Sequence, residues 1–367
     1  MDNVIRDKLV NRINSHNNNR IEYFEELISP KYLSEKLPVT THIKDFVNKS
    51  RITIENILSK KDKRFLMIIG PCSIHNVDEA KEYADKLKIL SDKFGKKIFV
   101  VMRVYFEKPR TTVGWKGLIN DPDLNDSNDV NKGLFEARKL LIYLANIGVP
   151  AGCEMLDPIT PQYISELISW GAIGARTTES QIHRQMVSGL SFPIGFKNGT
   201  NGDVEIAADA IISADHSHCF MGITEEGNPT ICKTRGNPYT HIILRGGWMA
   251  PNYHDITIRS IEDTLNKRNI DPRIMVDCSH GNSQKNYRFQ HFVFNDVIKQ
   301  INNGNQSIFG LMLESNINCG KQSLPENRTE LSLDEINEKL SYGVSVTDCC
   351  IDLEETEELL EHAFVKL

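Results

Sequence analysis

Short apolar runs alternate with amphipathic stretches eight times along this chain, and this alternation limits the folds open to it. Between most runs lies a stretch with helical periodicity, such as Val77–Phe94, Val130–Ile147 or Pro161–Trp170. Such runs are typical of buried strands, and eight strand–helix repeats predict a (β/α)8 barrel. A doubly wound open sheet is the alternative. The runs are Phe65–Gly70, Ile98–Arg103, Ala151–Leu156, Ala172–Arg176, Ile194–Lys197, His241–Arg245, Ile274–Cys278 and Ile308–Glu314.

Two segments are not needed for the barrel. After the fifth run, a helix over Val204–Ala214 is followed by two short strand-like stretches, His218–Ile223 and Thr230–Thr234, with a Gly-Asn-Pro turn between them. This pattern predicts a hairpin inserted at 218–234 between the fifth and sixth barrel strands. Before the first run comes a polar arm and then a helix over Thr41–Lys60. We therefore predict an N-terminal extension over 1–60 and a barrel over 61–367.

Composition excludes several classes of protein. With 367 residues, 40% of them hydrophobic, the chain can bury a large core, and a net charge of −6 argues against a nucleic-acid partner. No apolar run approaches the roughly 20 residues that cross a bilayer, and the N-terminus lacks the apolar core of a signal peptide. The eight cysteines have no CxxC spacing, which indicates reduced thiols and a cytoplasmic location.

Each predicted strand is followed, at its carboxyl end, by a polar or ionisable side chain. Barrel enzymes carry their chemistry at this end of the strands, so the pattern predicts an active site there. The residues in chain order are Cys72, Arg103, Glu154, Arg176, Lys197, Arg245, His280 and Glu314.

The cations of this set, together with the loop after the second run, predict an anion site. Arg103, Lys108, Arg110 and Lys116 follow or end that run and are interleaved with Pro109, Gly114 and Gly117. Arginine and lysine bind carboxylate and phosphate oxygens, and Pro and Gly fix the loop that positions them. With Arg176, Lys197 and Arg245, the cations suffice for a small substrate that carries both a phosphate and a carboxylate.

A second group has metal-ligand chemistry. Cys72, His280 and Glu314, with Asp348, offer sulfur, nitrogen and oxygen donors. Such a mixed set suits Mn, Fe, Co or Zn better than Mg or Ca. Glu154 is a candidate proton-transfer group or a partner that orients a lysine, and Lys197 is alternatively a Schiff-base lysine.

Six longer motifs lie at the predicted strand ends: Gly70-Pro-Cys-Ser-Ile-His75, Met102-Arg-Val-Tyr-Phe-Glu-Lys-Pro-Arg-Thr-Thr112, Gly171-Ala-Ile-Gly-Ala-Arg-Thr-Thr-Glu-Ser180, Gly195-Phe-Lys-Asn-Gly199, Ile243-Leu-Arg-Gly-Gly247 and Asp277-Cys-Ser-His-Gly-Asn282. They resemble those of 3-deoxy-D-arabino-heptulosonate 7-phosphate (DAHP) synthases of the feedback-regulated class I type, and the similarity covers nearly the whole chain. The resemblance implies a transferase that condenses phosphoenolpyruvate with erythrose 4-phosphate and opens the shikimate pathway to aromatic amino acids.

The resemblance also implies roles for individual residues. One divalent ion of the Mn, Fe or Co class would be held by Cys72, His280, Glu314 and Asp348. The catalytic groups would be Lys108, Lys197, Glu154 and His280. Phosphoenolpyruvate would be bound by Arg103, Lys108, Ala175, Arg176, Lys197 and Arg245, and erythrose 4-phosphate by Pro109, Arg110 and Thr111. The segment Leu324–Tyr342 is longer than in many relatives. Because this segment precedes Asp348, the assignment of Asp348 follows least directly from the resemblance among the four ligands.

Feedback inhibition by an aromatic amino acid is a further implication, with the extension over 1–60 serving regulation or assembly as a homodimer or homotetramer. Because tyrosine-sensitive relatives tend to carry glycine at the position of Gly222, tyrosine is the favoured effector. A sister enzyme that uses arabinose 5-phosphate, a Schiff-base aldolase and a non-catalytic sugar-phosphate sensor are the alternatives. The effector pocket would be lined by Pro161, Gln162, Met186, Leu190, Ser191, Phe220 and Gly222.

Overall fold

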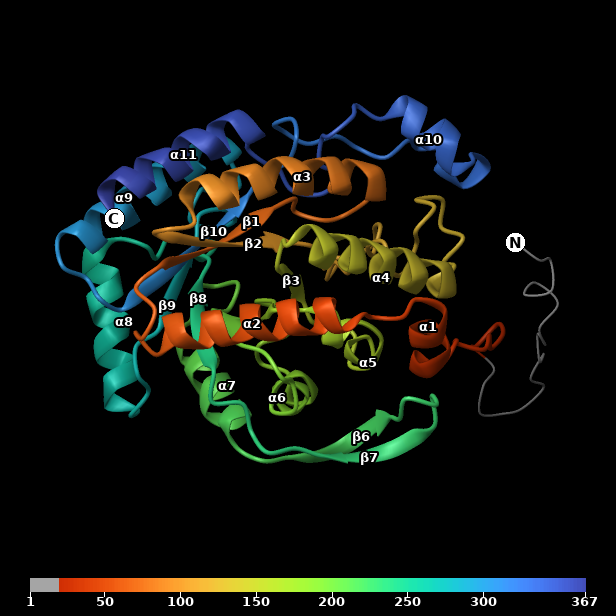
Figure 1. Ribbon diagram of the computed structural model, residues 1–367, viewed down its shortest axis with the longest axis horizontal. Coiled ribbons are helices and arrows are strands. Elements are labelled where there is room, and N and C mark those ends of the chain that lie inside the picture. The colour runs from red at the N-terminus through yellow and green to blue at the C-terminus, as the bar shows by residue number, and fades with distance from the viewer. Residues whose placement is uncertain (1–19) are drawn as a thin grey trace.

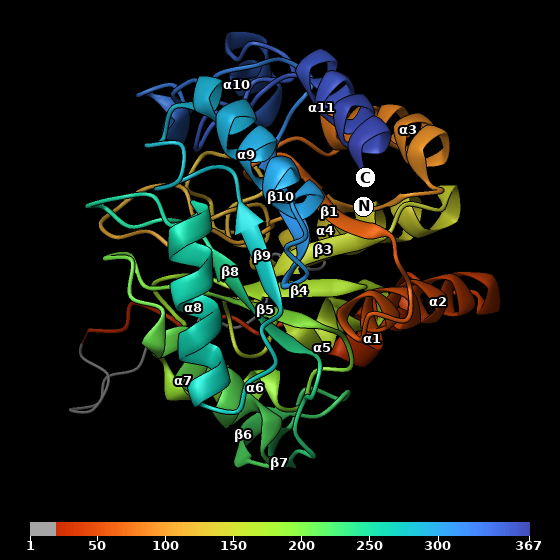
Figure 2. The same cartoon turned by 90° about the vertical axis from the view of Figure 1, so that its left-hand side faces the viewer.

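Eight parallel strands close into a barrel in the computed structural model, which describes residues 20–367 (Figures 1 and 2). The order around the barrel is β1-β10-β9-β8-β5-β4-β3-β2. The predicted (β/α)8 barrel is therefore confirmed, and the open-sheet alternative is wrong. The bounds are β1 (Phe65–Gly70), β2 (Ile98–Arg103), β3 (Ala151–Glu154), β4 (Trp170–Ile173), β5 (Ile194–Lys197), β8 (Thr240–Leu244), β9 (Ile274–Asp277) and β10 (Ile308–Glu314).

Helices cover the outside of the barrel (Figure 2). Most are amphipathic, and α3 shows how one begins: the Asn76 side chain accepts hydrogen bonds from the backbone N–H groups of Asp78 and Glu79. The covering helices are α3 (Val77–Phe94), α4 (Val130–Ile147), α5 (Pro161–Ile164), α6 (Gln181–Val187), α7 (Glu205–Asp215), α8 (Asp255–Lys267), α9 (Gln290–Asn302) and α11 (Leu353–Lys366). Short helices in the connections are η2 (Ser165–Leu167), η3 (Tyr287–Phe289), η4 (Arg328–Glu330) and α10 (Leu333–Lys339).

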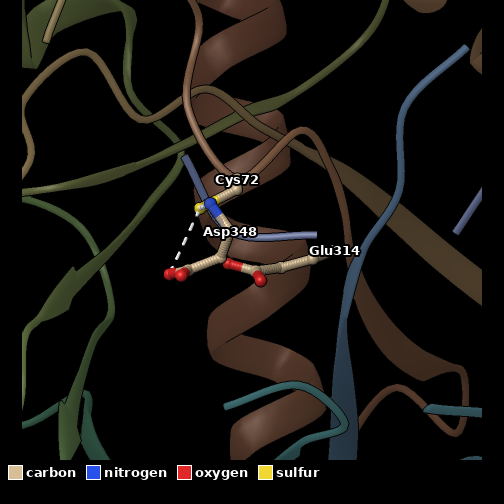
Figure 3. Close-up of side chains that lie close together, drawn as sticks. All are labelled: Cys72, Glu314 and Asp348. Carbon is tan, nitrogen blue, oxygen red and sulfur yellow. Dashed lines mark hydrogen bonds between the residues drawn. The ribbon is translucent and has the colours of Figure 1, made fainter. Parts of the chain in front are cut away.

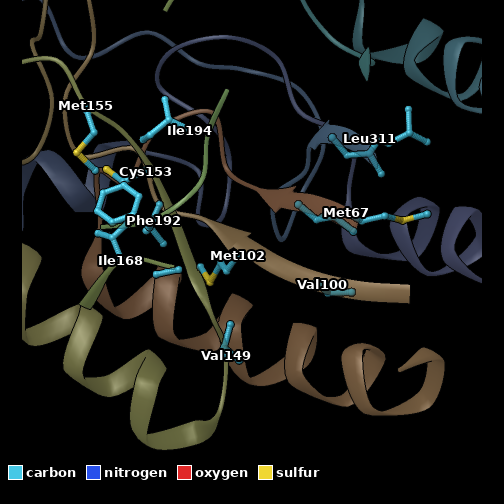
Figure 4. Close-up of a cluster of buried hydrophobic side chains, with 14 of the residues drawn as sticks. Met67, Val100, Met102, Val149, Cys153, Met155, Ile168, Phe192, Ile194 and Leu311 are labelled. Atoms are coloured by element: carbon cyan, nitrogen blue, oxygen red, sulfur yellow. The ribbon is translucent and has the colours of Figure 1, made fainter. Parts of the chain in front are cut away.

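The strands are apolar on both faces because both are buried. In β1 all six residues are buried: Leu66 and Ile68 belong to a core cluster with Trp170 and Met312, whereas Met67 and Ile69 belong to a larger cluster with residues of the covering helices. Figure 4 shows part of the larger cluster, where Met67 and Leu311 come from neighbouring strands. The two clusters fix the strands, and with them the side chains at the strand ends.

The inserted hairpin and the N-terminal extension meet outside the barrel. β6 (Cys219–Ile223) pairs antiparallel with β7 (Pro229–Lys233) between the fifth and sixth barrel strands, as predicted. The backbone N–H of Lys31, in α1 (Pro30–Lys36), donates to Glu225 O at 2.7 Å. Figure 1 shows α2 (Thr41–Leu58) beside the barrel and the hairpin projecting from it. Residues 1–19 of the predicted extension lie outside the described residues, and its role stays a prediction.

One predicted helix is wrong at its carboxyl end. The stretch Pro161–Trp170 is helical only to Leu167, because Trp170 starts β4 and its indole is fully buried in the inner cluster. Accordingly β4 starts before the predicted Ala172–Arg176, and Arg176 lies in the loop that follows. Among residues 20–367, no helix combines the length and apolar character that crossing a membrane requires.

Candidate active site

A cavity of about 760 Å³ opens at the carboxyl ends of the barrel strands. Cys72 and Glu314 are fully buried beside it, and Lys285, which the sequence analysis did not select, also lines it. Lys116 is not part of the lining. The structure thus brings the substrate-binding and catalytic candidates to one place. Those that line the cavity are Arg103, Lys108, Pro109, Arg110, Thr111, Glu154, Ala175, Arg176, Lys197, Arg245, His280 and Asp348.

Cys72, Glu314 and Asp348 form a compact group of possible metal ligands (Figure 3). One donor atom from each lies within 4.8 Å of the other two. Cys72 lies near Glu314 because β1 pairs with β10. Gly70, at the end of β1, is the register partner of Glu314, at the end of β10, and Cys72 follows β1. Burial, with the nearby Glu314 carboxylate, raises the pKa of the Cys72 thiol to about 11, and its Sγ donates to Asp348 Oδ2 at 3.8 Å.

His280, the fourth predicted ligand, stands beside this group. Its Nε2 is 3.7 Å from Glu314 Oε1, and its Nδ1 is 2.9 Å from Asp277 Oδ2. The backbone of His280 is left-handed, with a φ of 56°, an uncommon conformation for this residue type. The imidazole ring therefore lies between the buried carboxylates of Asp277 and Glu314. It is close to the group of Cys72, Glu314 and Asp348 but is not within 4.8 Å of all three donor atoms.

Asp277 is the main site residue that the sequence analysis missed. It is fully buried at the end of β9, and its Oδ2 accepts a hydrogen bond from Lys197 Nζ at 2.9 Å. Burial alone would raise the pKa of this carboxyl, but the positive charges of His280 and Lys197 hold it well below its usual range. Its position at a strand end, three residues before His280, was the signal that could have identified it.

Two buried cations flank the Cys72 group. Arg103 Nη2 donates to Glu314 Oε1 at 2.9 Å, and the guanidinium lies 3.6 Å from the centroid of the Tyr105 ring. Lys108 Nζ is 3.2 Å from Cys72 Sγ. Burial disfavours the Lys108 ammonium, but the nearby Cys72 and Glu314 outweigh this effect and raise the pKa of Lys108. Positive charge is thus fixed beside the buried donors.

Glu154 presents a carboxylate oxygen without a partner. Its side chain is buried, and its Oε1 accepts no hydrogen bond from any residue of the 20–367 range. A Cβ at Gly174 would lie 2.2 Å from that oxygen, so only glycine leaves room for it. Because unpaired buried carboxylates are costly, this geometry points to a ligand or water in the cavity.

The cations at the mouth of the cavity are more exposed. Arg176 Nε donates to Thr111 Oγ1 at 2.9 Å and so joins the loop after β4 to the loop after β2. Arg110 lies in the second of these loops and is also exposed. The Arg245 backbone N–H donates to Asn198 Oδ1 at 2.8 Å, which fixes the start of the loop after β8. Arg110 and Arg176 are exposed and Arg245 is half-buried, so three loops place guanidinium groups where they can bind anionic groups of a substrate.

A second cavity, of about 580 Å³, lies between the hairpin and the segment of α5 and α6. On the hairpin it is lined by Phe220, Gly222 and Cys232, which share one face of the two-stranded sheet. All seven residues predicted for an effector pocket line this cavity: Pro161, Gln162, Met186, Leu190, Ser191, Phe220 and Gly222.

The sequence between residues 40 and 361 matches the DAHP synthetase I family. The chain belongs to this family. It is accordingly an enzyme of the DAHP synthase type, and the predicted resemblance is confirmed. The match spans all eight barrel strands and the inserted hairpin.

Characterised relatives cover almost the whole chain. A phospho-2-dehydro-3-deoxyheptonate aldolase described as Tyr-sensitive, from Salmonella typhimurium, is 48% identical over 94% of both chains. A Trp-sensitive one from Escherichia coli K12 is 50% identical over 93% of this chain and 95% of its own. A solved aldolase structure of the same name from Francisella tularensis has a TM-score of 0.89 and 48% identity, covering 94% of this chain and 98% of its own.

Proposed function

We propose that this DAHP synthase family member condenses phosphoenolpyruvate with D-erythrose 4-phosphate and water, and releases DAHP and phosphate. The observation that carries the proposal is the single cavity in which buried lysines, exposed arginines and the Cys72 group converge. Two substrates with phosphate groups repel each other in water. A site with cations at two depths can hold both in reacting position.

We propose that the two substrates bind at different depths of the cavity. Arg103, Lys108 and Lys197 are buried at the floor, where the carboxylate and phosphate of phosphoenolpyruvate would lie, with Ala175, Arg176 and Arg245 above them. Pro109, Arg110 and Thr111 are at the outer rim, which suits the phosphate of the longer aldose. Because Arg176 donates to Thr111, the two subsites share a hydrogen bond and are built as one unit.

The residues around Cys72 fit a divalent transition ion. Cys72, Glu314 and Asp348 offer one sulfur and two oxygen donors, and His280 is the nearest imidazole. This mixed donor set favours Mn, Fe or Co over Mg or Ca. When bound, such an ion supplies Lewis acidity toward the aldehyde oxygen of the aldose. Binding requires the Cys72 thiol to lose the proton that it now shares with Asp348.

Carbon–carbon bond formation follows from how the chain holds the two substrates. The enol carbon of phosphoenolpyruvate attacks the aldehyde carbon, and positive charge develops on the neighbouring carbon, where water adds. Glu154, through its unpartnered Oε1, takes a proton from that water, and the aldehyde oxygen, which becomes an alkoxide as the carbon–carbon bond forms, takes up one proton, so the addition neither gains nor loses a proton overall. Lys108 and Lys197 balance the phosphate charge until phosphate leaves from the hemiketal, and Asp277 keeps Lys197 and His280 in place.

Two assays distinguish this reaction from its alternatives. Loss of phosphoenolpyruvate is measured with erythrose 4-phosphate and with arabinose 5-phosphate side by side; turnover of the second sugar alone would identify the sister reaction. Borohydride is then added during turnover. A covalent adduct on Lys197 would identify a Schiff-base aldolase; in the structure Lys197 Nζ lies 2.9 Å from Asp277 Oδ2 in an ion pair.

Regulation by an aromatic amino acid is proposed for the cavity beside the hairpin. That cavity combines apolar walls from Met186, Leu190 and Phe220 with the Gln162 amide and the Ser191 hydroxyl, which suits a ring and an amino-acid backbone. Tyrosine is the proposed effector. Tyrosine and tryptophan both occur in the descriptions of the relatives. Initial rates with tyrosine, phenylalanine or tryptophan added singly test the proposal, and insensitivity to all three would refute it.

Assembly and location complete the proposal. We propose a homodimer or homotetramer in which residues 1–60 serve regulation, and sedimentation of the purified chain measures its size. All eight cysteines are free. Free thiols fit a reducing compartment, so we propose that the enzyme acts in the cytoplasm.

A further inference from the structure

Two apolar side chains face the charged cavity at its mouth. Trp248, in the loop after β8, lines the cavity with 76% of its surface exposed, and Val113, in the loop after β2, does so with 89% exposed. β2 and β8 lie four positions apart in the closed ring of eight strands. The two side chains therefore stand on opposite sides of the mouth.

The backbone of Trp248 is anchored. Its N–H donates to Thr200 O at 3.0 Å, and the N–H of Gly247 donates to Ala250 O at 2.9 Å. A Cβ at Gly247 would lie 2.6 Å from the backbone oxygen of Asn201, so the loop base is packed directly against the neighbouring loop. This anchoring fixes where the indole emerges, at the rim of the substrate cavity.

The facing loop is also closed at its base. The backbone N–H of Lys108 donates to Lys116 O at 2.8 Å, and the loop between them carries Val113 and Arg110. A Cβ at Gly114 would lie 2.7 Å from Arg110 Nη2, so glycine lets the guanidinium fold across the loop. The apolar Val113 and the phosphate-binding candidate Arg110 thus belong to one compact flap.

We propose that the Trp248 indole covers the carbon chain of the bound aldose phosphate and, with Val113, closes the cavity to bulk water. This inference rests on the proposed function. An indole exposed to water gains free energy when apolar C–H groups are placed against its face. The cover has a chemical consequence: if bulk water reached the enol, the methylene carbon would take a proton in place of the aldehyde and water would add to the neighbouring carbon, which hydrolyses phosphoenolpyruvate to pyruvate and phosphate without forming the carbon–carbon bond.

The test compares Trp248→Ala with Trp248→Phe and with Met249→Ala as the matched control. Met249 is the next residue and is 78% exposed, but it does not line the cavity. We expect Trp248→Ala to raise the KM for erythrose 4-phosphate about tenfold and to release more phosphate than DAHP. Trp248→Phe should retain most of both properties, and Met249→Ala should match the unmodified enzyme.

Tryptophan fluorescence gives an independent readout. Trp115 and Trp170 are buried, at 5% and 0% exposed, so a blue shift when both substrates bind reports on Trp248. The shift should disappear in Trp248→Phe. An unchanged KM for the aldose, together with equal phosphate and DAHP release in Trp248→Ala, would overturn the inference while leaving the proposed function intact. Absence of DAHP formation by the unmodified enzyme would overturn the proposed function first.

Discussion

Replacing Gly222 by alanine tests how the effector cavity is built. Gly222 lies on β6, and a side chain at this position would point to the same face of the hairpin as Phe220 and Cys232. A Cβ at position 222 would be 2.7 Å from Cys232 Sγ, whereas ordinary contact begins at 3.4 Å. The backbone of Gly222 is not in the left-handed region, so the expected effect is steric. The Cys232 side chain must therefore move, and the cavity wall moves with it.

The size of the effect follows from the crowding. Overpacking of a core costs roughly 1–3 kcal/mol; because Cys232 is half-buried and its sulfur ends a short side chain, we take a value near the lower end, about 1.4 kcal/mol in effector binding, which is a tenfold change. We therefore expect Gly222→Ala to raise the tyrosine concentration for half-inhibition about tenfold. The second substitution, Cys232→Ala, removes the colliding sulfur. The double variant should recover most of the inhibition, since residues in contact are not additive.

The assay is the initial rate of DAHP formation over a titration of tyrosine, for the unmodified chain, both single variants and the double variant. The rate without effector is the internal control, because the cavity lies outside the barrel. Equal inhibition of Gly222→Ala and the unmodified chain would refute the steric reasoning. An equal loss of tyrosine inhibition in Gly222→Ala and in the double variant would show that the collision with Cys232 is not the cause of the loss.

Three further substitutions test other parts of the account. Arg110→Ala should raise the KM for erythrose 4-phosphate about tenfold and leave that for phosphoenolpyruvate unchanged; the reverse pattern would show that the two subsites are misassigned. Arg176→Ala should impair use of phosphoenolpyruvate by tenfold or more in the same steady-state assay, and an unaffected KM would remove it from that subsite. Glu107→Gln addresses stability. Burial, with Asp157, raises the pKa of Glu107 to about 8, against roughly 4.3 in an unfolded chain. A raised carboxyl pKa destabilises the fold as the pH rises from about 4 to 8, so the variant should gain in melting temperature over the unmodified chain across that range. A gain independent of pH would contradict this reasoning.

The barrel could be predicted because its strands are apolar on both faces. The runs of β1, β2, β5 and β10 coincide with the observed bounds, because nearly all of their residues are buried and the runs are mostly apolar. β4 was misplaced because Trp170 continues the apolar pattern of the preceding helical stretch, whereas in the structure its indole packs in the inner cluster and Trp170 begins the strand. Propensity is a weak prior that tertiary contacts override.

The sequence allowed most residues of the site to be predicted, but not the contacts and distances between them. Sequence places Cys72 and Glu314 after neighbouring strands, yet Asp348 reaches them only because the bridge of Ser315 with Ile351 returns the chain to the barrel. Asp277 was missed because its carboxylate contacts other side chains of the site, Lys197 and His280, and these contacts appear only in the folded chain. The space that glycine was expected to leave at position 222 is taken by Cys232, a contact between strands that the sequence does not show.

The measurement that tests the central claim most directly is phosphate release from phosphoenolpyruvate, with and without erythrose 4-phosphate, before and after a strong chelator and with Mn, Fe or Co added back. The account predicts release only when the aldose and an ion are both present, matched by DAHP formation, and loss of most activity in Cys72→Ala with an unchanged circular dichroism spectrum. Phosphate release at the same rate without erythrose 4-phosphate, or full activity after chelation and in Cys72→Ala, would contradict the account.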